Sequence, residues 1–259
     1  MLLRRVISHF RKQEWTAIGI DFVIVVVGVV MGIQVSNWNE ELETQRKAEV
    51  FTARLMTDLV NEAWAYQGLI EYQDDVLDSA ERAIDALTGE LAMSDEQFLI
   101  NAYRASNYSF TERSRATFDE LISTGEIGLI ADRKLRETAI YIYNTPVIDV
   151  VIESGQNSEL REMFRKSVPA KVQRALLTNC GDRVGEVGDY EALIDSLDYE
   201  CSLDLPESLL KEAADKLRAN EGLLPALQIR FADTETAAWV LTKSQSKMYE
   251  NLMEIGGAR

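Results

Sequence analysis

Residues 15–38 read WTAIGIDFVIVVVGVVMGIQVSNW, a mostly apolar run with one charge, Asp21, and a tryptophan at each end. At ~1.5 Å of rise per residue, a helix over this run is about 35 Å long, close to the hydrocarbon core of a bilayer plus its interfaces. Tryptophan is enriched at both membrane–water interfaces. The run therefore predicts a transmembrane helix over residues 15–38, and this helix decides the architecture.

The charges that flank the predicted helix indicate its orientation. Basic residues precede it and glutamates follow it: Arg4, Arg5, Arg11 and Lys12, then Glu40, Glu41 and Glu43. Because positively charged flanks stay in the cytoplasm, we expect a cytoplasmic N-terminus in a bacterial inner membrane and a periplasmic acidic α-helical domain over residues 40–259. A cleaved signal peptide is the alternative, but the exit from the apolar run, VSNWNEE, has no small-x-small cleavage site.

Residues 1–13 are predicted to form a cytoplasmic amphipathic segment. Leu3, Val6, Ile7 and Phe10 fall on one side of a helix, and the basic residues fall on the other. We expect this segment to lie on the inner leaflet and to fix the height of the span, with a flexible basic tail as the alternative. The residues expected to contact the membrane interface are Phe10, Arg11, Lys12, Trp15 and Trp38.

The charge balance beyond the membrane excludes two classes of partner. The chain has 27 basic and 43 acidic residues, and only four of the basic and two of the acidic ones lie at or before Asp21. The rest of the chain is therefore strongly acidic. Nucleic acids and anionic lipid surfaces are bound by basic patches, so we expect the exported domain to bind neither.

Both cysteines, Cys180 and Cys201, lie in the predicted periplasmic domain. An oxidising compartment favours a disulfide between them, with two free buried thiols as the alternative. In the chain-entropy model, closing a loop of this size stabilises the fold by roughly 3 kcal/mol.

Helical periodicity continues beyond the membrane. Apolar residues recur every three or four positions from Phe51 to Tyr66 and again after Gly68, which predicts one long helix or a kinked pair ending at Thr88 and Gly89. Caps, glycines and prolines predict further helices over residues 94–105, 114–124, 133–144, 147–166, 169–179, 207–219 and 225–253. Strand alternation is absent. The predicted fold class is all-α, a single transmembrane helix that continues into a periplasmic helical bundle.

Residues 181–206 are predicted to be irregular and are rich in carboxylates. Their spacing matches no EF-hand loop, so we interpret them as a solvated loop tied by the disulfide rather than as a calcium site. The only histidine is His9, before the span, so the exported domain has no imidazole for a Ser-His or Cys-His nucleophile or for zinc. We expect no metal, no cofactor and no enzymatic activity.

One face of the predicted span carries small and polar residues. Asp21, Val25, Gly28, Gly32 and Val35 recur at steps of four and three, and Gly28 with Gly32 forms a GxxxG pair. Such pairs let two helix backbones approach closely, which predicts a helix–helix interface. Two interpretations of Asp21 stay open: it is buried against a partner helix, where it pairs or relays protons, or it marks the inner membrane interface.

Two segments resemble an uncharacterised bacterial membrane family, domain of unknown function 6090. The first is DFVIVVVGVVMGIQVSNWNEE, where Gln34, Asn37, Trp38, Asn39 and Glu40 match a Gln-x-x-Asn-Trp-Asn-Glu pattern. The second is TFDELISTGEIGLIADRKLRETAIYIYN, with Leu121, Gly125, Leu129, Ile130 and Leu135 at matching places. Asp21, Gly32 and Ser36 stand where the family usually has Glu, Ala and Asn. The resemblance implies a membrane topology and no activity.

These observations favour a non-enzymatic single-pass protein that acts as a structural or accessory subunit. Its expected partners are membrane lipids and its own copies or other membrane-protein subunits. One alternative is a periplasmic ligand-sensing domain that signals through a partner. The other is an oligomeric proton or ion path that uses Asp21.

Overall fold

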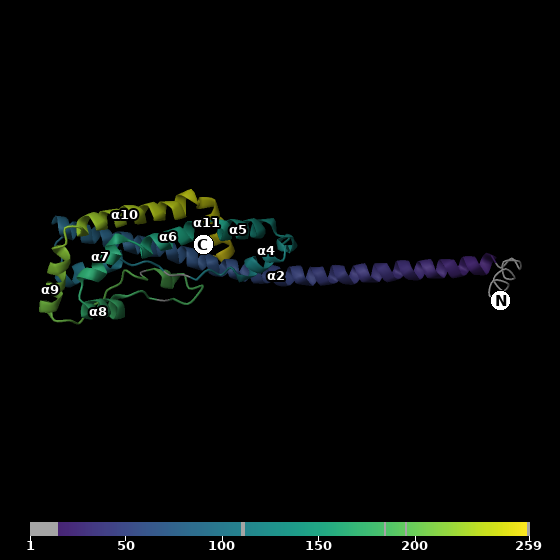
Figure 1. Cartoon of the computed structure of the whole chain (residues 1–259), viewed down its shortest axis with the longest axis horizontal. Helices are drawn as coiled ribbons and strands as arrows, with labels where there is room; N and C mark the ends of the chain where they lie inside the picture. The colour runs from purple at the N-terminus through teal and green to yellow at the C-terminus, as the bar shows by residue number, and fades with distance from the viewer. Residues whose placement is uncertain (1–14, 110–111, 184, 195, 258–259) are drawn as a thin grey trace. The chain divides into compact units, whose positions relative to one another are not determined.

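The computed structural model describes residues 15–109, 112–183, 185–194 and 196–257, and every regular element in those ranges is a helix (Figure 1). The predicted all-α class is confirmed. The chain forms two compact units, Met1–Thr52 and Ala53–Arg259. The α-helices are α2 (Trp15–Thr88), α3 (Asp95–Ala105), α4 (Ala116–Ser123), α5 (Arg133–Asn144), α6 (Val147–Gln156), α7 (Glu159–Ser167), α8 (Ala170–Cys180), α9 (Glu207–Arg218), α10 (Leu223–Trp239) and α11 (Ser246–Gly256). Three short elements join them: the 3₁₀ turns η1 (Ile127–Leu129) and η2 (Glu191–Leu193), and the π-helical turn η3 (Val240–Ser244).

Helix α2 is one continuous helix rather than a kinked pair. Gly68 does not break it; a Cβ at that position would stand 3.0 Å from Leu193 Cδ2, so this glycine makes room for a close packing contact. The helix ends at Thr88, as predicted. Gly89 adopts a left-handed φ of 85°, and the Glu90 N–H donates to the Asp85 carbonyl at 2.9 Å, the bond of a Schellman cap.

The first unit is described from residue 15 onward and consists of the first part of α2. Within the described residues, α2 is the one helix that is long and apolar enough to cross a membrane, and no residue of its apolar window is buried. The amphipathic segment predicted over residues 1–13 lies outside the described residues.

The second unit buries the predicted stripe of α2 in a core of its own. Leu55, Leu59 and Ala63 have no exposed surface, and Tyr66 is 1% exposed. Farther along, the buried positions are Val76, Ala80 and Ala83, whereas Ile84 and Leu87 are only partly covered. Helices α3, α7, α8, α9 and α10 contribute to one hydrophobic cluster with the end of α2, in which α3 packs on α9 and α10 packs on α7.

The predicted helix over residues 147–166 is wrong, because the chain forms two helices there, α6 and α7. Helix α6 ends where Gly155 comes close to Tyr108: a Cβ on Gly155 would stand 2.7 Å from Tyr108 Cβ. Helix α7 then begins with its own cap, because the Ser158 side chain accepts the Arg161 N–H. Helix α3 begins at a capping box, in which both hydrogen bonds between Ser94 and Gln97 are present.

The helix predicted over residues 225–253 is also divided. It begins at Leu223, and the π-helical turn η3 separates α10 from α11. The Tyr66 hydroxyl donates to the Leu241 carbonyl at 2.8 Å, so a side chain of α2 bonds a carbonyl of the wide turn. The predicted helix over residues 114–124 begins later, at Ala116, because the Ser114 backbone is bonded elsewhere: its N–H donates to Glu62 and its carbonyl accepts from Tyr143.

Candidate functional site

The face of α2 proposed as a helix–helix interface is exposed. Asp21 is exposed, and so are Val25 at 64% and Val35 at 63%. A Cβ built on Gly28 or Gly32 would meet no heavy atom within 4 Å. At 3.6 residues per turn these five positions lie within about 40° of Asp21 around the helix axis. They form one narrow stripe, called the Gly-Asp stripe below, that no described part of the chain covers.

The residues expected at the membrane interface are only partly described. Trp38 is 65% exposed, which suits a side chain placed at a lipid–water boundary. Phe10, Arg11 and Lys12 lie outside the described residues. Trp15 is the first residue of α2, and its side chain is not among those described.

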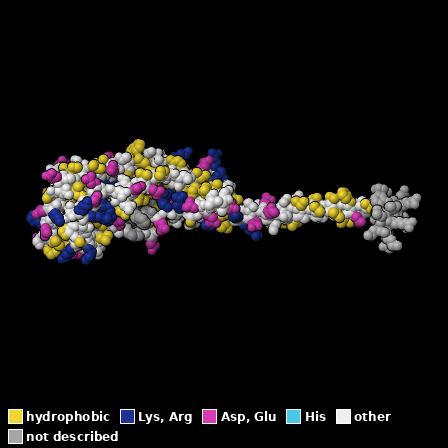
Figure 2. Space-filling view, viewed as in Figure 1, with side chains coloured by type: hydrophobic (Ala, Val, Ile, Leu, Met, Phe, Trp, Pro, Cys, Tyr) yellow, Lys and Arg dark blue, Asp and Glu magenta, His cyan; other side chains and the backbone are white. Residues whose placement is uncertain are grey.

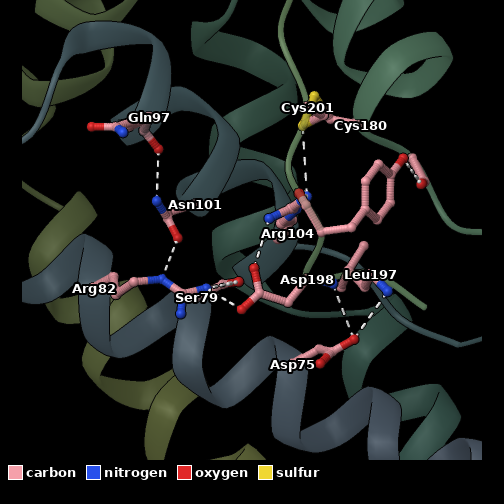
Figure 3. A network of polar contacts seen from close by, with 12 residues as sticks. Asp75, Ser79, Arg82, Gln97, Asn101, Arg104, Cys180, Leu197, Asp198 and Cys201 are labelled. Carbon is pink, nitrogen blue, oxygen red and sulfur yellow. Dashed lines mark hydrogen bonds and ion pairs between the residues drawn. A yellow bond between two sulfur atoms is a disulfide. The ribbon is translucent and has the colours of Figure 1, made fainter. Parts of the chain in front are cut away.

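A polar network in the second unit ties the acidic loop to α2 and α3 (Figure 3). Arg82 donates to Asn101 Oδ1 and to Asp198 Oδ2, both at 2.8 Å. Arg104, whose side chain is 5% exposed, donates to Asp198 Oδ1 at 2.7 Å. One loop carboxylate therefore bridges an arginine of each helix.

The same loop is held at three further points. Asp75 Oδ2 accepts the backbone N–H groups of Leu197 and Asp198 at 2.9 and 3.1 Å (Figure 3). Cys180 and Cys201 form a disulfide with an S–S distance of 2.09 Å. Tyr72 donates its hydroxyl to Asp182 at 3.0 Å, and burial raises the pKa of Tyr72, which keeps this donor protonated. The sequence predicted a solvated loop tied by the disulfide; the structure has that disulfide and adds ion pairs and hydrogen bonds that hold the loop to α2 and α3.

A second, more deeply buried ion pair joins α2 to the segment before α4. Glu62 is 1% exposed and accepts from Arg113 Nε and, at 3.1 Å, from the Ser114 N–H. Arg113 also donates to the Ile142 carbonyl at 3.2 Å, at the end of α5. Burial raises the pKa of Glu62, and the Arg113 charge acts in the opposite direction. This pair fixes three segments around one buried carboxylate.

These polar clusters hold the second unit together, and none of them forms a recognisable catalytic arrangement. Among the described residues no group of three or more His, Cys, Asp or Glu side chains stands where it could hold a metal ion. Both networks consist of arginine–carboxylate pairs whose charges offset one another. Such pairs, with their hydrogen bonds, position backbone segments.

Two open hollows lie on the second unit. One, of about 730 Å³, borders the polar network at Arg82, Arg104 and Tyr199. The other, of about 640 Å³, lies between α5 and the η3–α11 region and is lined by Thr138, Tyr141, Gln245 and Met248, among others. Tyr141 donates to Gln245 Oε1 across it at 2.6 Å. Both volumes fall in the range of small-molecule sites.

Sequence reasoning missed both arginine networks. Arg82 and Arg104 lie 116 and 94 residues from Asp198 along the chain, and Arg113 lies 51 residues from Glu62. No local spacing in the sequence could pair residues so far apart. One indirect indication of the Glu62–Arg113 pair was present in the sequence. Glu62 stands among the apolar residues of the α2 stripe, where burial of an unpaired charge is costly.

The resemblance to a known family extends over more of the chain than the two quoted segments. The model of a family of unknown function, DUF6090, matches residues 21–168, which include the Gly-Asp stripe, the Glu62–Arg113 pair and helices α3 to α7. No curated protein and no solved structure matches the chain. Because the matched residues make up more than half of its length, the chain belongs to the DUF6090 family of unknown function.

Proposed function

We propose that this protein is a non-enzymatic, single-pass subunit of the bacterial inner membrane that associates through its span with its own copies or with other membrane proteins. In this proposal the N-terminus is cytoplasmic and the second unit is a helical bundle in the periplasm. The polar networks described above keep that bundle folded, and the span provides the association surface.

The observation that carries the proposal is the exposed Gly-Asp stripe. A helix with a mostly apolar surface is found in a protein core or in a membrane, and within the described residues all of residues 18–38 of α2 are exposed, with hydrophobic side chains along much of their length (Figure 2). Gly28 and Gly32 leave a groove in which a second helix backbone can lie at close range. A partner helix would also shield Asp21 from lipid, where an ionised carboxylate costs about 3 kcal/mol on insertion scales.

Matched glycine substitutions test the association surface. Gly28→Leu and Gly32→Leu should convert oligomers or co-purified complexes to monomers in native mass spectrometry and cross-linking in mild detergent. Gly19→Leu is the control, because Gly19 is also uncovered but lies about 160° from Asp21 around the helix. A wild-type protein that is only monomeric and brings no other protein with it would refute the proposal, and so would an equal effect of all three substitutions.

The proposed orientation is tested separately. Protease added to intact spheroplasts should digest the second unit, because the basic flank before the span keeps the N-terminus in the cytoplasm. A second unit that stays intact while a periplasmic control protein is cut would reverse the topology.

A second candidate function is small-molecule binding by the helical unit. The hollow of about 640 Å³ between α5 and α11 favours it, because its size and its mixed polar and apolar lining suit a ligand. A specific thermal shift of the full chain with one member of a metabolite panel, abolished by Tyr141→Ala, would favour this function. The absence of any shift across the panel would count against it.

A further inference from the structure

A third, smaller hollow lies in the second unit between the end of α3, α7 and α8. Its volume is about 280 Å³, and its wall includes the rings of Tyr103 and Phe164, whose centroids are 6.0 Å apart. Three arginines also line it: Arg161 and Arg165 from α7, and Arg174 from α8. The hollow thus combines an aromatic surface with three guanidinium groups.

The charge of this hollow is unusual for so acidic a chain. Its lining contains no aspartate or glutamate. The arginines of the two networks, Arg82, Arg104 and Arg113, each bind a carboxylate, whereas within the described ranges Arg161, Arg165 and Arg174 form no ion pair. Although the chain has a net charge of −16, no described carboxylate forms an ion pair with any of these three guanidinium groups.

Hydrogen bonds and a ring contact hold Arg161 and the two helices that carry the cluster in place. Arg161 Nη1 donates to the Ser106 carbonyl at 3.1 Å, and its guanidinium carbon stands 4.6 Å from the centre of the Tyr108 ring. Gln173 joins α8 to the end of α7 by donating to the carbonyls of Arg165 and Val168 at 2.9 and 2.7 Å. The cluster is therefore held on two helices whose relative position is braced.

The cluster carries an electrostatic cost in the absence of an anion. Burial lowers the pKa of Arg161, and the neighbouring charge of Arg165 lowers it further. Asp182 interacts electrostatically with Arg161, but it is not part of the lining, and it accepts hydrogen bonds from Tyr72 and Asn107. An anion in the hollow would remove the repulsion between the arginines.

We propose that Arg161, Arg165 and Arg174 form a binding site for a small phosphate-bearing anion. The planar guanidinium group donates two parallel hydrogen bonds to phosphate oxygens. A site with several such groups is better matched by a doubly charged phosphate ligand than by a singly charged carboxylate ligand. The volume of about 280 Å³ admits inorganic phosphate or a compact phosphate monoester. The proposal depends on the second unit alone and is independent of association through the span.

Calorimetric titration tests the site in the full chain held in nanodiscs of phosphatidylcholine. Inorganic phosphate at constant ionic strength should bind saturably, and Arg165→Gln and Arg174→Gln should each weaken binding about tenfold or more, because each removes charge-assisted hydrogen bonds. Both arginines are exposed enough for the substitutions to leave the fold intact. Lys171→Gln is the matched control, since Lys171 is an exposed cation of α8 outside the lining, and it should change the affinity less than about twofold.

Two results would overturn the site: no saturable binding by the wild-type protein, or an equal loss of affinity in Lys171→Gln, which would indicate attraction to general surface charge. A second arm identifies the source of the phosphate group. In nanodiscs that contain phosphatidylglycerol, weaker binding of free phosphate by the wild-type protein, but not by Arg174→Gln, would assign the site to a lipid headgroup. Unchanged binding would assign it to a soluble anion.

Discussion

Two parts of helix α2 have similar secondary structure and opposite surroundings. Between residues 18 and 35 its large apolar side chains are all exposed, from 42% for Val26 to 69% for Phe22. Between residues 55 and 83 one stripe, which includes Leu55, Leu59 and Ala80, has no exposed surface at all. The helix is continuous through both parts, so backbone hydrogen bonding does not distinguish them.

The difference lies in what covers the apolar surface. In the second unit the chain covers it with its own helices, and the burial of each large aliphatic side chain contributes about 1.5–3 kcal/mol. Between residues 18 and 35 no described residue covers it. The comparison shows that residues 18–38 have the length and the apolar composition to cross a membrane, and in our proposal lipid and a partner helix cover them.

The comparison predicts that breaking a buried contact of the second unit has the largest effect on stability. Arg113→Ala leaves the carboxylate of Glu62 buried and unpaired, so we expect the free energy of unfolding to fall by about 3–5 kcal/mol. Urea denaturation in mild detergent, followed by near-ultraviolet circular dichroism, measures this loss.

Arg115→Ala is the control for that experiment. Arg115 pairs with Asp119, but both side chains are about half exposed, and such pairs contribute less than about 1 kcal/mol. If both substitutions cost the same, the Glu62–Arg113 pair would not anchor α2 to the rest of the unit.

One substitution at two places in α2 tests the comparison directly. Val76 has no exposed surface and packs with Tyr72 and Leu197, whereas Val27 is 46% exposed. Val76→Ala should lower the free energy of unfolding by about 1.5–3 kcal/mol, because it removes buried methyl groups and leaves a cavity. Val27→Ala should change it by less than about 0.5 kcal/mol in the same urea titration. Equal losses would contradict the view that only the second part of α2 is stabilised by this chain.

The helix bounds that the sequence predicted correctly are those set by local signals. Local patterns were sufficient for the bounds of α2, α3, α5 and α8, because caps, prolines and a left-handed glycine lie at their ends. They failed at α6–α7, although the Ser158 cap of α7 is a local feature, and at η3, where Tyr66 donates to the Leu241 carbonyl from a distant part of the chain. Tertiary contacts of this kind leave no periodic trace.

The candidate sites divide in the same way. The Gly-Asp stripe is visible in the sequence because it repeats along one helix, with steps of three and four residues. The arginine cluster of α7 and α8 is not, because Arg174 is brought to Arg161 only when two helices pack. In the sequence these three arginines stand among many other charged residues, and no motif distinguishes them.

The smallest expected effect concerns the pH dependence of the Glu62–Arg113 pair. Burial already raises the pKa of Glu62, and Arg113 is the main influence that lowers it, so Arg113→Ala should raise that pKa further. A carboxyl whose pKa is higher in the folded state binds more protons when folded. Its contribution is therefore fully present below the unfolded pKa and is lost as the pH rises through the folded one.

The loss caused by Arg113→Ala should accordingly be smaller at pH 5 than at pH 7, because protonation of Glu62 at the lower pH removes the unpaired buried charge. Urea titrations of the wild type and the variant at both pH values measure this difference, with Arg115→Ala again as the variant that should show none. A loss that is the same at pH 5 and pH 7 would mean that Glu62 finds another partner or water when Arg113 is removed. In that case the buried carboxylate would be less isolated than its 1% exposure indicates.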